Sequence, residues 1–222
     1  MIRRGDRGLA LLAAVIAAGC LAAGIWQLRR LAARRARNAV AAARLAEAPL
    51  VLTSGRIAPD STRLRRVSAR GVFDYAHERV WAYRSFDGTP GVALVTPLRF
   101  GDGSTVLVDR GWVPSPDALH VDAAGYRESD TVAIEGVVVD VPKRETDSIR
   151  VLVQQEAPAP PLPLGLPRRW PAPALDNGPH LSYAIQWFSF AVIIGVGTTA
   201  LLRRRHASDA AHASQVGPAT TI

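Results

Sequence analysis

Cysteine is nearly absent from this 222-residue chain, and its scarcity excludes several kinds of chemistry. The single cysteine, Cys20, cannot form an internal disulfide, and no CxxC pair is present to bind a metal or to exchange electrons. Copper delivery through paired thiolates is disfavoured for the same reason. Cys20 lies in a hydrophobic run, where we expect it to act as a small apolar filler.

The short motifs of common enzymes are missing as well. The sequence has no GxSxG, no HExxH and no phosphate-binding glycine loop with its lysine. The histidines show no metal-ligand spacing among the first three, and they stand at His77, His120, His180, His206 and His212. We therefore predict that the protein is not an enzyme.

Formal charge is missing from two long stretches, residues 8–28 and 181–202. As α-helices, these stretches are about 30 Å long, which matches the hydrocarbon core of a bilayer. Neither stretch has the polar face that a water-soluble helix of this length normally shows. We predict two transmembrane helices at these positions.

The first hydrophobic stretch has an alternative interpretation as a cleaved secretory signal. Arginines precede it, and residues 17–20 (AAGC) resemble a lipoprotein cleavage box. However, the run is longer than a usual signal core, and it ends at Trp26 before Arg29 and Arg30, the pattern of an interfacial anchor. We favour a retained span, with the cleaved signal as the alternative.

The net charge of +8 is concentrated beside the two spans. Juxtamembrane arginines typically meet anionic lipid headgroups, and no nucleic-acid-binding motif accompanies them. Arginines at both termini favour a cytoplasmic location for the chain ends, whereas those that follow the first span favour the opposite. Long translocated domains largely escape the charge rule, so we favour cytoplasmic termini and an extracytoplasmic central domain.

The region between the spans changes from helical to strand-like composition. Residues 29–48 are rich in alanine and arginine and predict a juxtamembrane helix that stops at Pro49. Residues 49–155 hold short valine-, threonine- and aromatic-rich segments, with a tight hairpin at 101–104. Strands are predicted at 64–73, 78–86, 92–100, 105–112 and 131–141.

These segments predict an α+β membrane protein, in which two transmembrane helices flank a mainly antiparallel β-domain or partial barrel. The proline-rich residues 156–179 cannot form a helix or a central strand, so we expect an extended tether. The polar residues 203–222 are expected to be a disordered cytoplasmic tail.

His180 begins the second span and is the most informative polar residue. Tyr183, Ala184 and Trp187 follow at i+3, i+4 and i+7, which places them on the same side of a helix. An imidazole above an aromatic-lined apolar strip could coordinate haem iron. The same residue types also gather at membrane interfaces because they are amphipathic, and the residues alone leave both interpretations open.

Four segments, in order along the chain, resemble the SURF1 family of cytochrome c oxidase assembly factors. Residues 24–29 (GIWQLR) look like its GxWQxxR signature, and residues 66–74 (RVSARGVFD) look like its VxxxGxFD segment. Residues 106–114 (VLVDRGWVP) are similar to its VLVxRGWVP strand, and residues 180–188 (HLSYAIQWF) to its HLxYAxxWF motif. The chain departs from the family in one respect. The family often has an asparagine directly before the histidine, whereas here Gly178 and Pro179 separate Asn177 from His180.

The resemblance implies an integral protein of the bacterial plasma membrane that helps haem a reach subunit I of the oxidase. Subunit I, haem a synthase and membrane lipids are the partners it suggests, and nucleic acid is not among them. By resemblance, His180 would ligate the haem iron, and Tyr183 and Trp187 would line the macrocycle. We expect Arg110 to be a structural ion-pair partner rather than a propionate ligand. The alternative function is a cofactor-free scaffold that stabilises an oxidase assembly intermediate.

Overall fold

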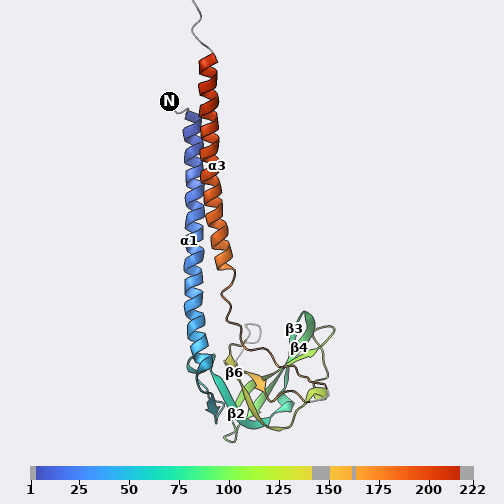
Figure 1. Cartoon of the computed structure of the whole chain (residues 1–222). Helices are drawn as coiled ribbons and strands as arrows, with labels where there is room; N and C mark the ends of the chain where they lie inside the picture. The colour runs from blue at the N-terminus through green and yellow to red at the C-terminus, as the bar shows by residue number, and fades with distance from the viewer. Residues whose placement is uncertain (1–3, 142–150, 162–163, 216–222) are drawn as a thin grey trace, which may run out of the picture. The chain divides into compact units, whose positions relative to one another are not determined.

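The chain consists of two compact units (Figure 1). A computed structural model describes residues 4–141, 151–161 and 164–215. Met1–Asn38 and Asp176–Ile222 form a helical unit, and Ala39–Leu175 form a β-rich unit. Two long apolar helices thus flank a central β-domain, which confirms the predicted α+β class.

The two long helices are α1, Arg4–Ala46, and α3, His180–Gln215. Each contains a stretch long and apolar enough to cross a membrane, Gly5–Ala46 and His180–Ser208, so the protein is a membrane protein with two spans. Helix α1 runs without a break through most of residues 29–48, because alanine and arginine are strong helix formers. For the same reason α3 continues through residues 203–215, where the prediction of a disordered tail is wrong, and the rest of that predicted tail, 216–222, lies outside the described residues.

Helices α1 and α3 pack antiparallel through small residues. The row of α1 that faces α3 includes the buried Cys20, Gly24 and Leu31, at the spacing of a left-handed helix pair. A Cβ atom on Gly24 would lie 2.5 Å from the ring of Phe188, so the two backbones are close at this point. Small residues permit such close approach in membranes, where packing rather than apolar burial holds helices together.

In the described part of the β-rich unit, seven strands form one sheet in the spatial order β1-β2-β6-β7-β5-β4-β3. Strand β2 also pairs with β4, which closes β2, β6, β7, β5 and β4 into a small barrel. Among the described strands only the β1–β2 and β5–β7 pairs are parallel, so the mainly antiparallel partial barrel is confirmed. The bounds are β1 Leu50–Leu52, β2 Arg66–Phe73, β3 Arg79–Phe86, β4 Thr89–Arg99, β5 Thr105–Pro114, β6 Thr131–Val139 and β7 Leu152–Ala157.

All five predicted strands are present, and Gly103 adopts a positive φ in the hairpin between β4 and β5. Three short helical turns connect the strands: α2 Pro59–Thr62, η1 Tyr75–His77 and η2 Ala123–Tyr126. Strands β1 and β7 were not predicted, because β1 has three residues and β7 carries polar residues through its second half.

Alternating side chains of the barrel strands fill its interior. The central cluster includes Val67, Leu98, Val108, Ile134 and Val153, each with at most 1 % of its surface exposed. Burial of apolar surface on this scale is the main source of stability for a small domain. Three polar residues of the described chain, Thr96, Arg110 and Gln155, are also fully buried, and the contacts of Arg110 are described below.

Candidate functional site

His180 stands at the first position of α3, and the residues before it determine how that helix begins. Gly178 has φ +65°, a left-handed conformation that glycine adopts without steric cost, and its N–H donates to Asp176 Oδ1 at 2.6 Å. The carbonyl of Pro179 then accepts from the Tyr183 N–H and from the Ser182 hydroxyl. Asp176 and Gly178 therefore position the turn that brings His180 to the start of the span.

The imidazole of His180 is directed at α1. Its Nδ1 lies 2.9 Å from Oε1 of Gln27, and the pair is partly buried. An amide oxygen only accepts hydrogen bonds, so Nδ1 of the neutral ring carries the proton and Nε2 keeps its lone pair. Among the described residues nothing hydrogen-bonds to Nε2, so that nitrogen is available to a ligand.

Gly178 lies beside the Nε2 edge of the His180 ring. A Cβ atom at Gly178 would lie 3.7 Å from Nε2 and 3.6 Å from Cδ2 of His180, in van der Waals contact with the ring. The residues on this side of His180 therefore fit an incoming ligand rather than a closed internal contact.

The neighbours of His180 in the predicted site divide between two faces of α3. Ala184 is buried against α1, whereas Tyr183 and Trp187 expose 47 % and 36 % of their surfaces. The Trp187 ring makes an edge-on contact with Phe190, with ring centroids 5.9 Å apart. Tyr183 and Trp187 thus form an exposed aromatic flank beside the imidazole, and their contact with a macrocycle stays a prediction.

The remaining described histidines have local partners or are exposed. His77 pairs with Asp74 at 2.9 Å and His120 with Asp117 at 2.7 Å, each three residues away in the sequence. His206 is exposed on the continuation of α3. In the part of the chain that the structure describes, no group of three or more His, Cys, Asp or Glu side chains could hold a metal ion.

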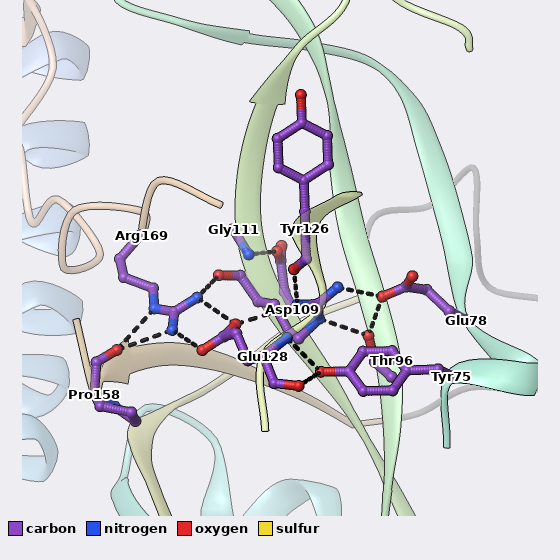
Figure 2. Close-up of polar contacts among 10 residues, drawn as sticks. Tyr75, Glu78, Thr96, Asp109, Gly111, Tyr126, Glu128, Pro158 and Arg169 are labelled. Carbon is purple, nitrogen blue, oxygen red and sulfur yellow. Dashed lines mark hydrogen bonds and ion pairs between the residues drawn. The ribbon is translucent and has the colours of Figure 1, made fainter. Parts of the chain in front are cut away.

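A second polar constellation lies in the β-rich unit, around Arg110 of β5 (Figure 2). The Arg110 side chain is fully buried and forms ion pairs with Glu78, at 2.5 Å, and Glu128, at 3.2 Å. Its Nε donates to the Thr96 hydroxyl, and its Nη1 donates to the Tyr126 carbonyl. Nearly all of its donors are therefore satisfied within the chain, as a buried guanidinium requires.

Arg169 completes this buried cluster. Its Nη2 lies 2.6 Å from Glu128 Oε2, and its Nη1 donates to the backbone carbonyl of Arg110. The two arginines and the carboxylates of Glu78 and Glu128 balance in charge, which reduces the cost of removing them from water. The expected structural role of Arg110 accounts for these contacts without a propionate.

Arg169 belongs to the segment predicted as a proline-rich tether, and the structure attaches that segment to the barrel. The first residues of the segment lie in β7, and Arg168 forms a two-hydrogen-bond bridge with Trp112, at 2.8 and 2.7 Å. Gly111 permits this approach, because its φ is +128° and a Cβ atom there would lie 2.3 Å from the Arg168 carbonyl oxygen. The described residues of this segment, 156–161 and 164–170, are therefore attached to the barrel at several points.

Asp109 is the adjacent buried acid. Its Oδ1 accepts from the Gly111 N–H and from the Trp170 indole N–H, both at 3.0 Å. Burial raises the pKa of the Asp109 carboxyl from 3.8 to about 6, and the two hydrogen bonds oppose this shift only in part. The carboxyl therefore changes protonation in a pH range close to neutral.

Sequence reasoning identified His180 and Arg110 but missed their partners. Gln27 lies in the GIWQLR motif of residues 24–29. Its spacing from Gly24 and Leu31 places it on the same side of α1, and this spacing could have predicted that it faces α3. Glu128 and Arg169 gave no comparable signal, because their pairing depends on chain segments that are far apart in sequence.

Comparison with known proteins supports the arrangement of motifs. The sequence model of the SURF1 family matches residues 14–192, which include the first span, the barrel and the start of the second span. A SURF1-like protein of Monosiga brevicollis is 28 % identical, over 77 % of this chain and 78 % of its own length.

Uncharacterized SURF1-like proteins of Mycobacterium bovis and Mycobacterium tuberculosis are also similar. Each is 28 % identical over 63 % of this chain. The matched region covers 60 % of the length of these mycobacterial proteins.

Proposed function

This chain belongs to the SURF1 family, and from that membership together with the His180 site we propose that it binds haem a transiently and delivers it to subunit I of cytochrome oxidase. At the coarser level, the family implies an assembly factor for cytochrome oxidase. Members of the family are assembly factors rather than enzymes, and we assign this chain the same non-catalytic role.

The observation that carries the proposal is the free Nε2 of His180. Nδ1 contacts Gln27, and among the described residues Nε2 has no hydrogen-bond partner. A neutral imidazole with one free nitrogen is the usual axial ligand of haem iron. His180 would hold the iron of the cargo through this atom.

The exposed aromatic flank supports the same assignment. Tyr183, Trp187 and Phe190 expose between 36 % and 47 % of their surfaces on a helix that spans the membrane. Flat apolar rings beside a ligating nitrogen suit the faces of a porphyrin, and the bilayer supplies an apolar environment for the rest of it. A single protein ligand at an open position also suits a cargo that must leave again.

The proposal includes a location. The two spans lie in a bacterial plasma membrane with the barrel on the extracytoplasmic side, and haem a synthase is a second expected partner, as the source of the cargo. Long translocated domains largely escape the charge rule, which supports this orientation despite the arginines that follow the first apolar stretch.

The test is purification of the full chain, in mild detergent, from cells that make haem a. Wild type is expected to carry haem a with an imidazole-ligated visible spectrum, and His180→Ala is expected to lose it. His206→Ala is the matched control, because His206 is an exposed histidine on the same helix. Equal haem content and equal spectra in wild type and His180→Ala would refute the proposal.

Oxidase assembly in membranes separates this function from a cofactor-free scaffold. A haem carrier predicts that His180→Ala lowers the haem a content of subunit I. A scaffold predicts normal assembly in His180→Ala and loss of assembly when the barrel is disrupted at Arg110. His180→Ala therefore separates the two hypotheses, and the Arg110 variant verifies that the assay responds to loss of the barrel.

A further inference from the structure

We propose that Gln27 is the positioning residue of the His180 ligand: its amide oxygen holds the Nδ1 proton and thereby fixes Nε2 as the atom that meets the metal. The observation is the 2.9 Å contact between Gln27 Oε1 and His180 Nδ1. This inference rests on the proposed function, because it assigns a role to Gln27 in that same site.

The position of Gln27 follows from the packing of the two helices. It lies three residues after Gly24 and four before Leu31, on the row of α1 that faces α3. Gly24 brings the helices together against Phe188, two helical turns from His180 on the same side of α3. At this separation an amide side chain of α1 reaches the imidazole.

Contacts on the other side of His180 also fix the start of α3 against α1. Arg34 Nε and Asn38 Nδ2 both donate to the carbonyl of Asp176, at 3.0 and 2.8 Å. Asn38 Nδ2 also lies 3.2 Å from Oδ1 of Asn177. His180 therefore lies between two places where α1 contacts the second span and its preceding turn, at Gly24 and at Arg34 and Asn38. The packing of the two helices places it next to Gln27.

A fixed tautomer matters because the two ring nitrogens are not equivalent in this site. Nδ1 faces α1, and Nε2 lies beside Gly178. A ligand histidine commonly donates its second N–H to an acceptor, which orients the ring and makes the ligating nitrogen more basic, and loss of that acceptor costs about 10–100-fold in metal affinity. Without Gln27 the Nδ1 proton would lose the acceptor it has in this structure, and the ring would lose the contact that sets its orientation and its tautomer.

Three variants of the full chain test this role by titration with haem a in detergent. Gln27→Leu removes the acceptor at similar size, and it is expected to weaken haem a binding about 10–100-fold and to raise the reduction potential of the bound iron. Gln27→Glu keeps an acceptor oxygen, so it is expected to restore binding and to lower that potential. Gln186→Leu removes an exposed amide from the same membrane unit and is expected to behave like wild type.

The outcomes separate this inference from the proposed function. If His180→Ala loses haem a while Gln27→Leu keeps wild-type affinity and potential, Gln27 has no positioning role and only the proposed function stands. If Gln27→Leu and Gln27→Glu are equally impaired, Gln27 serves helix packing and the inference is overturned. If His180→Ala binds haem a like wild type, the proposed function itself fails. Thermal unfolding of each variant verifies that the helix pair is intact.

Discussion

Asp109 provides a quantitative prediction, because the structure places an acid where its charge is costly. Asp109 is buried, with 8 % of the residue's surface exposed, and its Oδ1 accepts hydrogen bonds from Gly111 and Trp170. Asp109→Asn keeps that oxygen as an acceptor for Gly111 and Trp170 and removes the ability to ionise. The substitution therefore isolates the cost of burying the charge.

The magnitude follows from the pKa. Burial raises the pKa of Asp109 from 3.8 to about 6, a difference of about two units or ~3 kcal/mol. A raised folded pKa means that the native state binds the proton more tightly, so its contribution to stability is complete below pH 3.8 and is lost as the pH rises through 6. Asp109→Asn is expected to match wild type near pH 4 and to be more stable by up to about 3 kcal/mol at pH 7 and above.

The assay is urea unfolding of the full chain in mild detergent between pH 4 and pH 8, followed by tryptophan fluorescence. Trp170 donates to Asp109 and thus reports on the site itself. Asp102→Asn is the control of opposite sign, because hydrogen bonds from Ser104 lower the pKa of Asp102 to about 2. Its carboxylate stabilises the hairpin above pH 3.8, so the asparagine variant is expected to lose stability at neutral pH and to match wild type only in strong acid.

Parallel stability curves for wild type and Asp109→Asn across this pH range would refute the reasoning. So would an asparagine variant that is less stable at pH 7, since it would mean that the ionised carboxylate is a net stabilising group. A crossing of the two curves near pH 5 would instead indicate that the amide disturbs the hydrogen bonds to Oδ1.

Three further predictions concern the barrel and the helix pair. Arg110→Met leaves the buried Glu78 carboxylate without its ion-pair partner and leaves Glu128 paired with Arg169 alone. It is expected to destabilise the barrel by about 3–5 kcal/mol in urea unfolding, whereas the exposed Arg79→Met is expected to cost little; equal effects would contradict a buried ion-pair role. Gly111→Ala places a methyl group against the Arg168 carbonyl and is expected to accelerate trypsin cleavage after that arginine, and an unchanged digestion rate would show that the segment is held elsewhere. Gly24→Leu forces α1 and α3 apart and is expected to weaken haem a binding in the same titration as above, an expectation that wild-type affinity would overturn.

The strands were predictable because their signal is local. Valine- and aromatic-rich segments between turn residues indicated β2 to β6, and the glycines of residues 101–104 indicated the hairpin. Strand β7 was not predicted because Gln154 and Gln155 interrupt its apolar pattern, although Gln155 is fully buried. Local composition does not report burial that is created by neighbours distant in sequence.

The proline-rich segment illustrates a different failure. Proline excludes helices and central strands, and extended structure was the correct consequence. It does not exclude packing, and here Arg169 and Trp170 attach the segment to the barrel through Glu128 and Asp109. The partners of these side chains come from loops and strands that only the folded topology brings together.

Arg110 and His180 are both polar residues of the family motifs, and they differ in whether the chain provides partners for all of their hydrogen-bonding groups. Arg110 uses its donors on two carboxylates, a hydroxyl and a carbonyl, so it has little left to offer a ligand and it supports the barrel. His180 uses Nδ1 on Gln27, and among the described residues its Nε2 has no hydrogen-bond partner, at the first residue of a membrane-spanning helix. A polar atom left available at such a position points to a function outside the chain, and for this reason we assign binding to the histidine and support to the arginine.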